Sequence, residues 1–335
     1  MKDINTKEKT NMLEFEQKHW SSGIEHIAGI DEAGRGPLAG PVAAAAVILP
    51  KNVDLPEVTD SKKISEKKRE RLFDEIYKIA LSIGVGVVHE EVIDKKNILQ
   101  ATYQAMRHSL GQLSISPEVI LVDGNKADIK HYEQESIING DQKSLSIAAA
   151  SIIAKVTRDR MMRQFDIVFP EYGFAKHKGY GTKQHIEAIQ KSKATPIHRK
   201  SFNPVSHHLP NMAYLQRNRL LGKLGEQLAA CKMIRIGHEM VEMNYNVPKV
   251  GELDIISKDS DMLVFTEVKT QMGGQGWGEP RWQITEKKRD RIMNAVQHYM
   301  DNNELNCDFR FDVAEVILGS GKPQINIIKD GMTKY

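Results

Sequence analysis

Two adjacent carboxylates, Asp31 and Glu32, stand directly before the glycine-flanked arginine of Gly34-Arg35-Gly36. The apolar residues 27–30 predict a buried strand that ends at the two acids. Neighbouring strand residues point to opposite faces, so without a bulge only one acid points straight into a site. Glycines let backbone N–H groups approach a ligand closely, and arginine suits phosphate. The pattern is typical of a metal-dependent enzyme that acts on phosphates, although a solvated Asp-Glu turn has the same appearance.

Further carboxylates follow at the ends of other apolar segments. Residues 119–122 predict a second buried strand, which ends at Asp123. Asp141 precedes the apolar segment 144–165, which predicts a buried helix, and capping that helix is the alternative role for this residue. Asp159 lies inside the same segment between two arginines, where we expect a surface ion pair.

These acids belong to a longer series of motifs that resembles ribonuclease HII. The matching segments occur in the order of that family, and they are residues 29–42, 60–63, 122–125, 140–141, 146–159 and 177–182. The resemblance implies a ribonuclease H-like fold, in which helices flank a mixed sheet. It also implies a catalytic and metal-binding set, with Asp159 left as a structural helix residue. That set is Asp31, Glu32, Asp123 and Asp141.

The implied chemistry is metal-assisted hydrolysis of a phosphodiester. Clustered carboxylates can hold two divalent ions about 3.5–4 Å apart, one activating water and the other stabilising the leaving oxygen. Mn²⁺ or Mg²⁺ is the implied cofactor, because these hard cations prefer oxygen ligands. The implied substrates are RNA-DNA hybrids and duplex DNA that contains ribonucleotides. The cut falls 5′ of the ribonucleotide and leaves 3′-hydroxyl and 5′-phosphate ends.

Such an enzyme must also read the 2′-hydroxyl, because carboxylates and metals alone would cut DNA and RNA alike. In ribonuclease HII a Gly-Arg-Gly turn and a tyrosine perform this task. The resemblance therefore implies recognition residues Gly34, Arg35, Gly36 and Tyr180. Lys62, Lys178 and the group 198–201 are predicted phosphate contacts, although each alone would be read as solvated surface charge.

The C-terminal third carries a second constellation. Residues 251–269 predict two strands of a hairpin, with Glu252 and Asp254 on one face of the first strand. Glu267 and Lys269 share a face of the second strand. Such a hairpin brings Asp254, Glu267 and Lys269 together. The two carboxylates could bind a metal, and the lysine could stabilise the charge of a phosphate. A half-exposed hairpin without a site shows the same alternation.

The wider pattern resembles the YraN-like family of small predicted endonucleases, within the PD-(D/E)xK nuclease superfamily. The matching segments are residues 222–226, 244–245, 251–254, 264–269 and 310–313. The resemblance implies a restriction-endonuclease-like α/β domain that binds DNA and whose site Glu226 would complete. Gln271 stands where family members often carry an arginine. Cleavage by this domain, DNA binding without cleavage, and a general DNA nuclease formed by the whole chain remain alternatives.

Length and composition agree with these expectations. A chain of 335 residues suggests two domains. The predicted organisation is a charged extension 1–23, a ribonuclease HII domain 24–209, a linker 210–219 and a YraN-like domain 220–330. The net charge of +3 requires local patches for any attraction to nucleic acid. Two cysteines exclude a disulfide framework, and the lack of an apolar span or signal peptide predicts a cytoplasmic protein without a membrane partner.

Overall fold

The structure is a computed structural model that describes residues 11–124, 129–273, 285–319 and 321–331. Asn125, which ends one predicted motif, lies outside these residues. The chain divides into two compact units, which are Met1–Arg160 with Ile197–Asn203 and Met161–Pro196 with Pro204–Tyr335. The predicted linker 210–219 contains helix α8 (Met212–Arg217). The bounds of the four predicted segments stay predictions.

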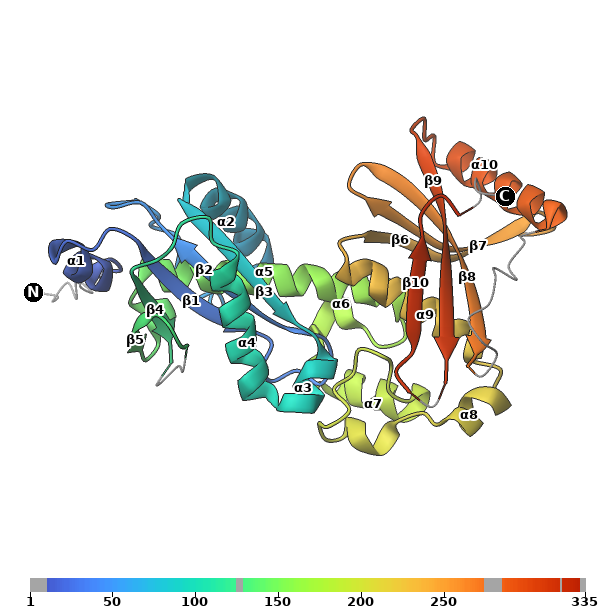
Figure 1. Cartoon of the computed structure of the whole chain (residues 1–335), viewed down its shortest axis with the longest axis horizontal. Coiled ribbons are helices and arrows are strands. Elements are labelled where there is room, and N and C mark those ends of the chain that lie inside the picture. The colour runs from blue at the N-terminus through green and yellow to red at the C-terminus, as the bar shows by residue number, and fades with distance from the viewer. Residues whose placement is uncertain (1–10, 125–128, 274–284, 320, 332–335) are drawn as a thin grey trace, which may run out of the picture. The chain divides into compact units, whose positions relative to one another are not determined.

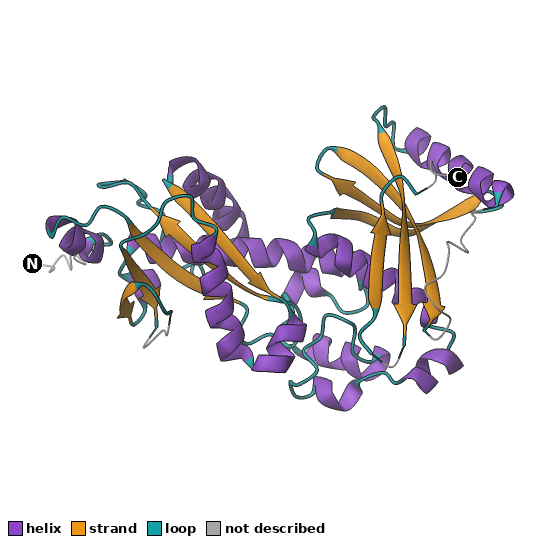
Figure 2. Ribbon diagram, in the orientation of Figure 1, coloured by secondary structure: helices purple, strands orange, loops and turns teal. Residues whose placement is uncertain are grey.

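A five-stranded mixed sheet forms the centre of the first unit (Figures 1 and 2). Its strands are β1 (Ile27–Ala33), β2 (Val42–Ile48), β3 (Ser82–Val88), β4 (Val119–Asp123) and β5 (Glu133–Ile137). They lie in the order β3-β2-β1-β4-β5, with β1 antiparallel to β2 and parallel to β4. The predicted mixed sheet is confirmed. Because β1 continues past residue 30, both Asp31 and Glu32 lie within the strand.

Helices cover both faces of this sheet. They are α1 (Glu14–Ser21), α2 (Glu66–Ile79), α3 (Glu90–Lys96), α4 (Ile98–Gly111) and α5 (Leu145–Val168), with a 3₁₀ turn at Gly140–Gln142. Strand β2 is apolar throughout, because its Ala44 packs into the core beneath α4 while Ala45 packs into the core beneath α2 and α5. A Cβ at Gly86 would lie 2.0 Å from the carbonyl oxygen of Ala105 in α4. Helix α4 therefore packs directly on the strand backbone.

The second unit contains another five-stranded sheet, in the order β10-β9-β8-β7-β6. Its strands are β6 (Glu239–Val247), β7 (Gly251–Asp259), β8 (Met262–Met272), β9 (Phe309–Leu318) and β10 (Gln324–Ile328). Its helices are α6 (Phe174–His177), α7 (Lys183–Ser192), α8, α9 (Leu221–Arg235) and α10 (Glu286–Asn302), with a 3₁₀ turn at Val205–His208. Ile256 of β7 lies opposite Phe265 of β8 in an antiparallel pair. The predicted hairpin is therefore confirmed.

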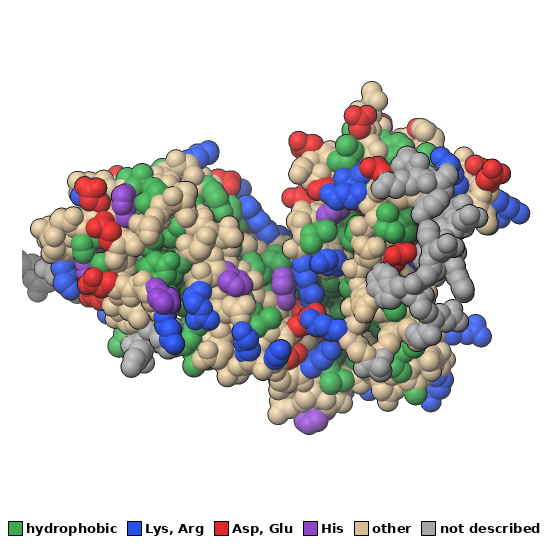
Figure 3. All heavy atoms as spheres, viewed as in Figure 1, with side chains coloured by type: hydrophobic (Ala, Val, Ile, Leu, Met, Phe, Trp, Pro, Cys, Tyr) green, Lys and Arg blue, Asp and Glu red, His purple; other side chains and the backbone are tan. Residues whose placement is uncertain are grey.

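The surface carries charges of both signs. On the face drawn in Figure 3, basic, acidic and hydrophobic side chains are interspersed, in keeping with the net charge of +3. Within the described ranges, the structure contains no helix with the length and apolar character needed to cross a membrane.

Candidate active site

The four acids predicted as metal ligands come from three neighbouring elements of the first unit. Strand β1 carries Asp31 and Glu32, the adjacent parallel strand β4 ends at Asp123, and Asp141 lies in the 3₁₀ turn before α5. The backbone N–H of Gly140 donates to Asp123 Oδ1 at 2.6 Å, which ties this turn to the end of β4. These four residues are called the first-unit carboxylates below.

Burial and mutual repulsion dominate the electrostatics of this group. Asp31 is only 4% exposed. Burial raises its pKa well above the usual range, and the charges of Glu32 and Asp123 raise it further, while a hydrogen bond with Ser151 opposes them. Burial, followed by nearby carboxylates that include Asp123, also raises the pKa of Asp141. The group therefore concentrates negative charge where water screens it poorly.

The chemistry of this donor set fits a divalent cation. All four groups offer carboxylate oxygens, which hard cations such as Mg²⁺ and Mn²⁺ prefer, and a cation would relieve their repulsion. As the side chains are placed in the described part of the chain, no group of three or more His, Cys, Asp or Glu residues is arranged to hold a metal ion. Joint ligation of an ion by the four acids therefore stays a prediction.

Two basic side chains accompany these acids: Arg35 donates to Glu32 Oε1 at 3.2 Å, and Lys62 interacts with the other acids through its charge. Burial lowers the pKa of Lys62, but the surrounding carboxylates, led by Asp31 and then Asp141, outweigh burial and raise it. Asp60 accepts a hydrogen bond from the backbone N–H of Lys62 at 2.9 Å and pairs with Lys63 at 3.4 Å. Asp60 is 5% exposed and contributes to the raised pKa of Asp141. Asp60 was not among the predicted site residues, although it lies two positions before a predicted phosphate contact.

Two buried arginines support the predicted recognition turn. Arg158 Nε donates to the carbonyl of Pro41 at 2.9 Å, and Arg199 donates to the carbonyls of Gly34 and of Arg35, the latter at 2.8 Å. Gly34 has a φ of +98°, and a Cβ there would lie 2.1 Å from Arg158 Nε, so only glycine fits. Arg199 was predicted to contact phosphate from the surface, but its side chain is 0% exposed. The prediction was wrong because backbone carbonyls satisfy this guanidinium inside the protein.

Two other charged residues are also more buried than predicted. Asp159 was expected to form a surface ion pair, but it is 2% exposed and accepts from Lys155 Nζ at 2.6 Å. Lys178 is 7% exposed, and its ammonium group donates to the carbonyl of Ala175 within its own turn. The phosphate contact predicted for Lys178 stays a prediction.

Tyr180 lies in the second unit, on the turn between α6 and α7, and its residue is 45% exposed. Its backbone N–H donates to the carbonyl of His177 at 2.9 Å, and its own carbonyl accepts from the N–H of Thr182 at 2.8 Å. His185 Nδ1 lies 2.9 Å from the same carbonyl and must donate to it. Burial lowers the pKa of His185 to about 4, so this ring is neutral at pH 7. The turn thus combines a fixed backbone with an exposed aromatic ring.

The predicted hairpin residues of the second unit do come together. The backbone N–H of Val268 donates to Asp254 Oδ2 at 2.6 Å, and Lys269 contacts Glu267 Oε1. Lys288, which α10 contributes, contacts the same oxygen of Glu267. Burial, followed by the charge of Glu267, raises the pKa of Asp254 to about 7. Lys288 was not among the predicted residues of this site, because no local pattern connects α10 with β8.

Glu226 on α9 interacts through its charge with Asp254 and Glu267, and its part in a site stays a prediction. Burial raises its pKa, the charges of Glu252 and Glu267 contribute, and a side-chain hydrogen bond with Asn244 opposes the shift. Glu252 itself is exposed at the edge of the group. The second-unit cluster is the name used below for Glu226, Asp254, Glu267, Lys269 and Lys288.

Comparisons with known proteins divide the chain at the same place as its motifs. The family model "Ribonuclease HII" matches residues 28–205, and the model "Uncharacterised protein family UPF0102" matches residues 225–316. The ribonuclease HII of Acetivibrio thermocellus is 56% identical over 191 residues, which cover 57% of this chain and 75% of that protein. The ribonuclease HII of Bacillus cereus strain G9842 is 54% identical over 207 residues, which cover 61% of this chain and 80% of that protein. The crystal structure of ribonuclease H2 from Pyrococcus horikoshii OT3 has a TM-score of 0.48 and 26% identity, covering 58% of this chain and 99% of that one. The sequence matches confirm both resemblances.

Proposed function

The chain belongs to the ribonuclease HII family, and we propose that the first-unit carboxylates are the site at which it acts. As a member of that family it is a metal-dependent endoribonuclease that hydrolyses RNA in RNA-DNA hybrids. The observation that supports this assignment is the gathering of acids from β1, β4 and the turn before α5, where burial raises the pKa of Asp31. All four acids lie within the matched residues 28–205.

We propose Mg²⁺ or Mn²⁺ as the cofactor, in a two-metal site. Two such ions supply an activated water and stabilise the leaving oxygen of an in-line displacement. The chain's part is to hold them: Asp31 and Asp123 offer oxygens from adjacent strands, and Asp141 offers oxygens from the turn. Lys62 keeps a positive charge among these acids. That charge lessens their repulsion and would attract the phosphate of the scissile bond.

We further propose that the turn 34–36 and Tyr180 read the 2′-hydroxyl, so that the enzyme cuts 5′ of a ribonucleotide embedded in duplex DNA. Because Arg158 and Arg199 bind the carbonyls of the loop that includes this turn, its conformation is set before substrate arrives. The exposed ring of Tyr180 is available to stack on a sugar while its backbone stays fixed. Each feature, within its own unit, supports recognition by preorganised groups.

A cleavage assay tests this proposal. The full-length protein is incubated with Mg²⁺ or Mn²⁺ and an end-labelled DNA duplex that carries one ribonucleotide, beside an all-DNA duplex of the same sequence. A single cut 5′ of the ribonucleotide, with the control intact, is the expected result. Equal cutting of both duplexes would instead mean that the second unit cleaves DNA or that the first unit does not read the 2′-hydroxyl. No cutting of either would indicate a nucleic-acid scaffold.

For the second unit we propose a divalent-cation site that binds DNA. The supporting observation is the meeting of Asp254 and Glu267 with two lysines, since carboxylates suit a cation and ammonium groups suit phosphate. The test uses full-length protein made inactive in the first unit by Asp123→Asn, mixed with all-DNA duplex and Mn²⁺. Mn²⁺-dependent binding that Asp254→Ala removes is expected. Strand cleavage under the same conditions would extend the proposal from binding to catalysis.

A further inference from the structure

We propose that helix α1 is a latch that positions Asp123 and Asp141 for the ribonuclease reaction, and that Glu16 is its main positioning residue. The inference rests on the proposed assignment of the first-unit carboxylates. Residues 1–23 are the predicted charged extension, and the ribonuclease HII family model matches only from residue 28. Neither the predicted extension nor the family match therefore assigns α1 a part in the reaction.

The carboxylate of Glu16 reaches from α1 to the beginning of α5. Glu16 is 2% exposed, and its Oε1 accepts from Ser144 Oγ at 2.6 Å, Ser146 Oγ at 2.7 Å and the backbone N–H of Ser146 at 3.0 Å. The first N–H groups of a helix have no partner within the helix and carry partial positive charge, so an acid stabilises them. Glu16 thus caps α5 from another element, directly after the turn that carries Asp141.

Backbone and apolar contacts reinforce this attachment. The N–H of Leu145, the first residue of α5, donates to the carbonyl of Met12 at 2.7 Å. Phe15 and Trp20 pack against the small core that includes Ile147 of α5. Helix α1 lies beside the start of α5 through charged, backbone and apolar contacts together.

Helix α1 is also attached to β5, the strand that pairs with β4 and its terminal Asp123. Lys18 Nζ lies 3.2 Å and His19 Nε2 lies 3.0 Å from Glu135 Oε2 on β5. Strand β5 runs parallel to β4, with Ile137 opposite Asp123. The pair with Lys18 is exposed to solvent and therefore weak. For this reason we assign the larger effect to the buried Glu16.

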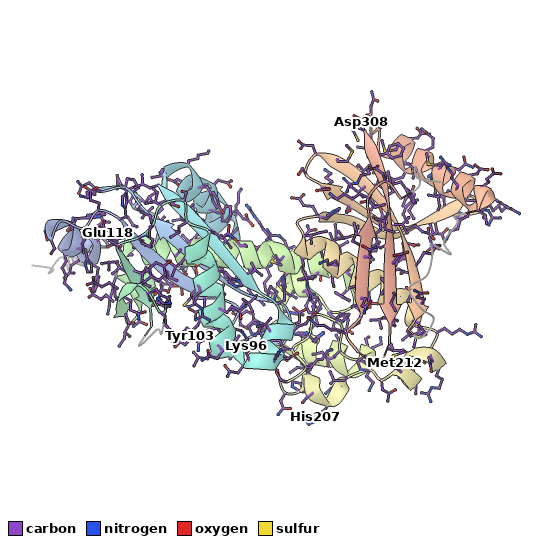
Figure 4. The ribbon with its side chains drawn as sticks, viewed as in Figure 1. Lys96, Tyr103, Glu118, His207, Met212 and Asp308 are labelled. Carbon is purple, nitrogen blue, oxygen red and sulfur yellow. The ribbon has the colours of Figure 1, made fainter. Side chains whose placement is uncertain are left out.

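The segment between α1 and β1 is held as well. Glu118, which Figure 4 labels, accepts from the backbone N–H groups of Glu25 and His26 at 2.8 and 2.9 Å with one carboxylate oxygen. This residue immediately precedes β4. The path from α1 to the strand that carries Asp31 is thus fixed against the strand that ends at Asp123. Helix α1 and the segment that follows it therefore contact α5, β5 and the residue before β4, which lie around the first-unit carboxylates.

Loss of the Glu16 carboxylate would leave buried donors of Ser144 and Ser146 without this acceptor. The first turn of α5 would shift so that these donors reach other acceptors. The adjoining 3₁₀ turn would shift as well, which would displace Asp141 and alter the hydrogen bond from Gly140 to Asp123. A displaced ligand lowers the affinity for the ion more than it changes the chemistry once the ion is bound. Changes in residues that orient metal ligands typically cost about 10–100-fold in affinity.

The test measures Mn²⁺ binding by isothermal titration to full-length protein that carries Asp254→Ala, so that the proposed second-unit site does not contribute. Cleavage of the ribonucleotide-containing duplex is measured over a range of Mn²⁺ concentrations. Glu16→Ala is expected to weaken Mn²⁺ binding at the first unit by about tenfold, with kcat at saturating Mn²⁺ close to that of the unaltered protein. Glu16→Gln keeps an acceptor oxygen and should restore most of the affinity. Glu14→Ala, an exposed acid of the same helix, is the matched control and should change neither quantity.

Unchanged Mn²⁺ affinity in folded Glu16→Ala would overturn the latch, even if its Tm falls, because Glu16 would then be merely structural. If that variant does not fold, Ser146→Ala decides: it removes one donor and should shift the Mn²⁺ dependence in the same direction by a smaller factor. Asp141→Asn separates this inference from the site assignment. If Asp141→Asn loses affinity while the Glu16 and Ser146 variants keep it, only the latch fails. If Asp141→Asn keeps full affinity and activity, the site assignment fails and the latch with it.

Discussion

The two units present their carboxylates in different electrostatic settings. Among the first-unit carboxylates, burial and mutual repulsion raise the pKa of Asp31, and two exposed bases, Arg35 and Lys62, accompany the acids. In the second-unit cluster, Lys269 and Lys288 both contact one oxygen of Glu267. The second unit therefore neutralises much of its own acid, whereas the first concentrates charge that calls for a cation. The difference indicates a strong demand for divalent metal in the first unit and a competition between metal and lysine in the second.

The largest expected effect comes from removing one acid of the first unit. Asp123→Asn should reduce ribonucleotide-directed cleavage by more than about 100-fold, the upper end for residues that only orient ligands. The same change should raise the Tm of the metal-free protein, because it removes one of several repelling charges while Asn retains the acceptor for Gly140. A gel assay and thermal unfolding in a chelator measure the two quantities. Full residual cleavage would remove Asp123 from the site, and a lower Tm would show that repulsion among the first-unit carboxylates does not destabilise the metal-free protein.

A change at Tyr180 should have a smaller effect, and it should alter the preference for substrate without altering metal binding. Tyr180→Phe removes a hydroxyl and keeps the ring, so the preference for ribo over deoxyribo substrate should fall by about 3- to 10-fold, as for the loss of one hydrogen bond. Duplex affinity and Mn²⁺ dependence should change little, because the turn backbone is held by His177 and His185. Competition between the two duplexes measures the preference. Equal losses in preference and in duplex affinity would assign Tyr180 to general binding.

Removal of a lysine from the second-unit cluster should strengthen metal binding there, because the lysine competes with the metal for Glu267. In a chain that carries Asp123→Asn, the further change Lys288→Gln should strengthen Mn²⁺ binding to the second-unit cluster by about threefold, since a half-exposed ion pair contributes modestly. Lys287→Gln, an exposed neighbour on α10, is the control. Isothermal titration measures the affinity. Equal or weaker binding in Lys288→Gln would show that this lysine does not compete with metal, and the contrast between the units would be lost.

Local signals predicted the strands and their terminal acids. Strand β4 ends at Asp123 as predicted, and β7 and β8 form the predicted hairpin, because alternation and apolar runs reflect burial within a few neighbouring residues. The same local signals predicted α5, which the structure places at Leu145–Val168. They also brought Asp254 and Glu267 to one site, since that placement follows from hairpin geometry alone.

Charged residues buried by distant partners escaped prediction. Glu16 bonds Ser146, which is 130 positions away, and Arg199 bonds the carbonyl of Gly34 across 165 positions. A buried charge is stable only where such partners compensate it, and the partners of these two residues are set by tertiary packing. The sequence therefore showed which residues can do the chemistry. It did not show which residues hold them in place.

The smallest effect is a pH dependence that belongs to the second unit. Burial and the charge of Glu267 raise the pKa of Asp254 to about 7, above the value of an unfolded chain. Between about pH 4 and 7 the folded state then binds more protons than the unfolded state, so the free energy of unfolding falls as the pH rises through this window.

Asp254→Asn removes the group that causes this pH dependence and keeps an acceptor for Val268. At pH 8 the Tm of the metal-free variant should therefore be a few degrees higher than that of the unaltered protein, since each kcal/mol of stability shifts Tm by roughly 2–4 °C. At pH 5 the difference in Tm should be smaller. Asp261→Asn, an exposed acid of the same hairpin, should show no such change. A Tm difference that is independent of pH would mean that the lysines of the second-unit cluster already neutralise Asp254, which would sharpen the contrast with the first unit.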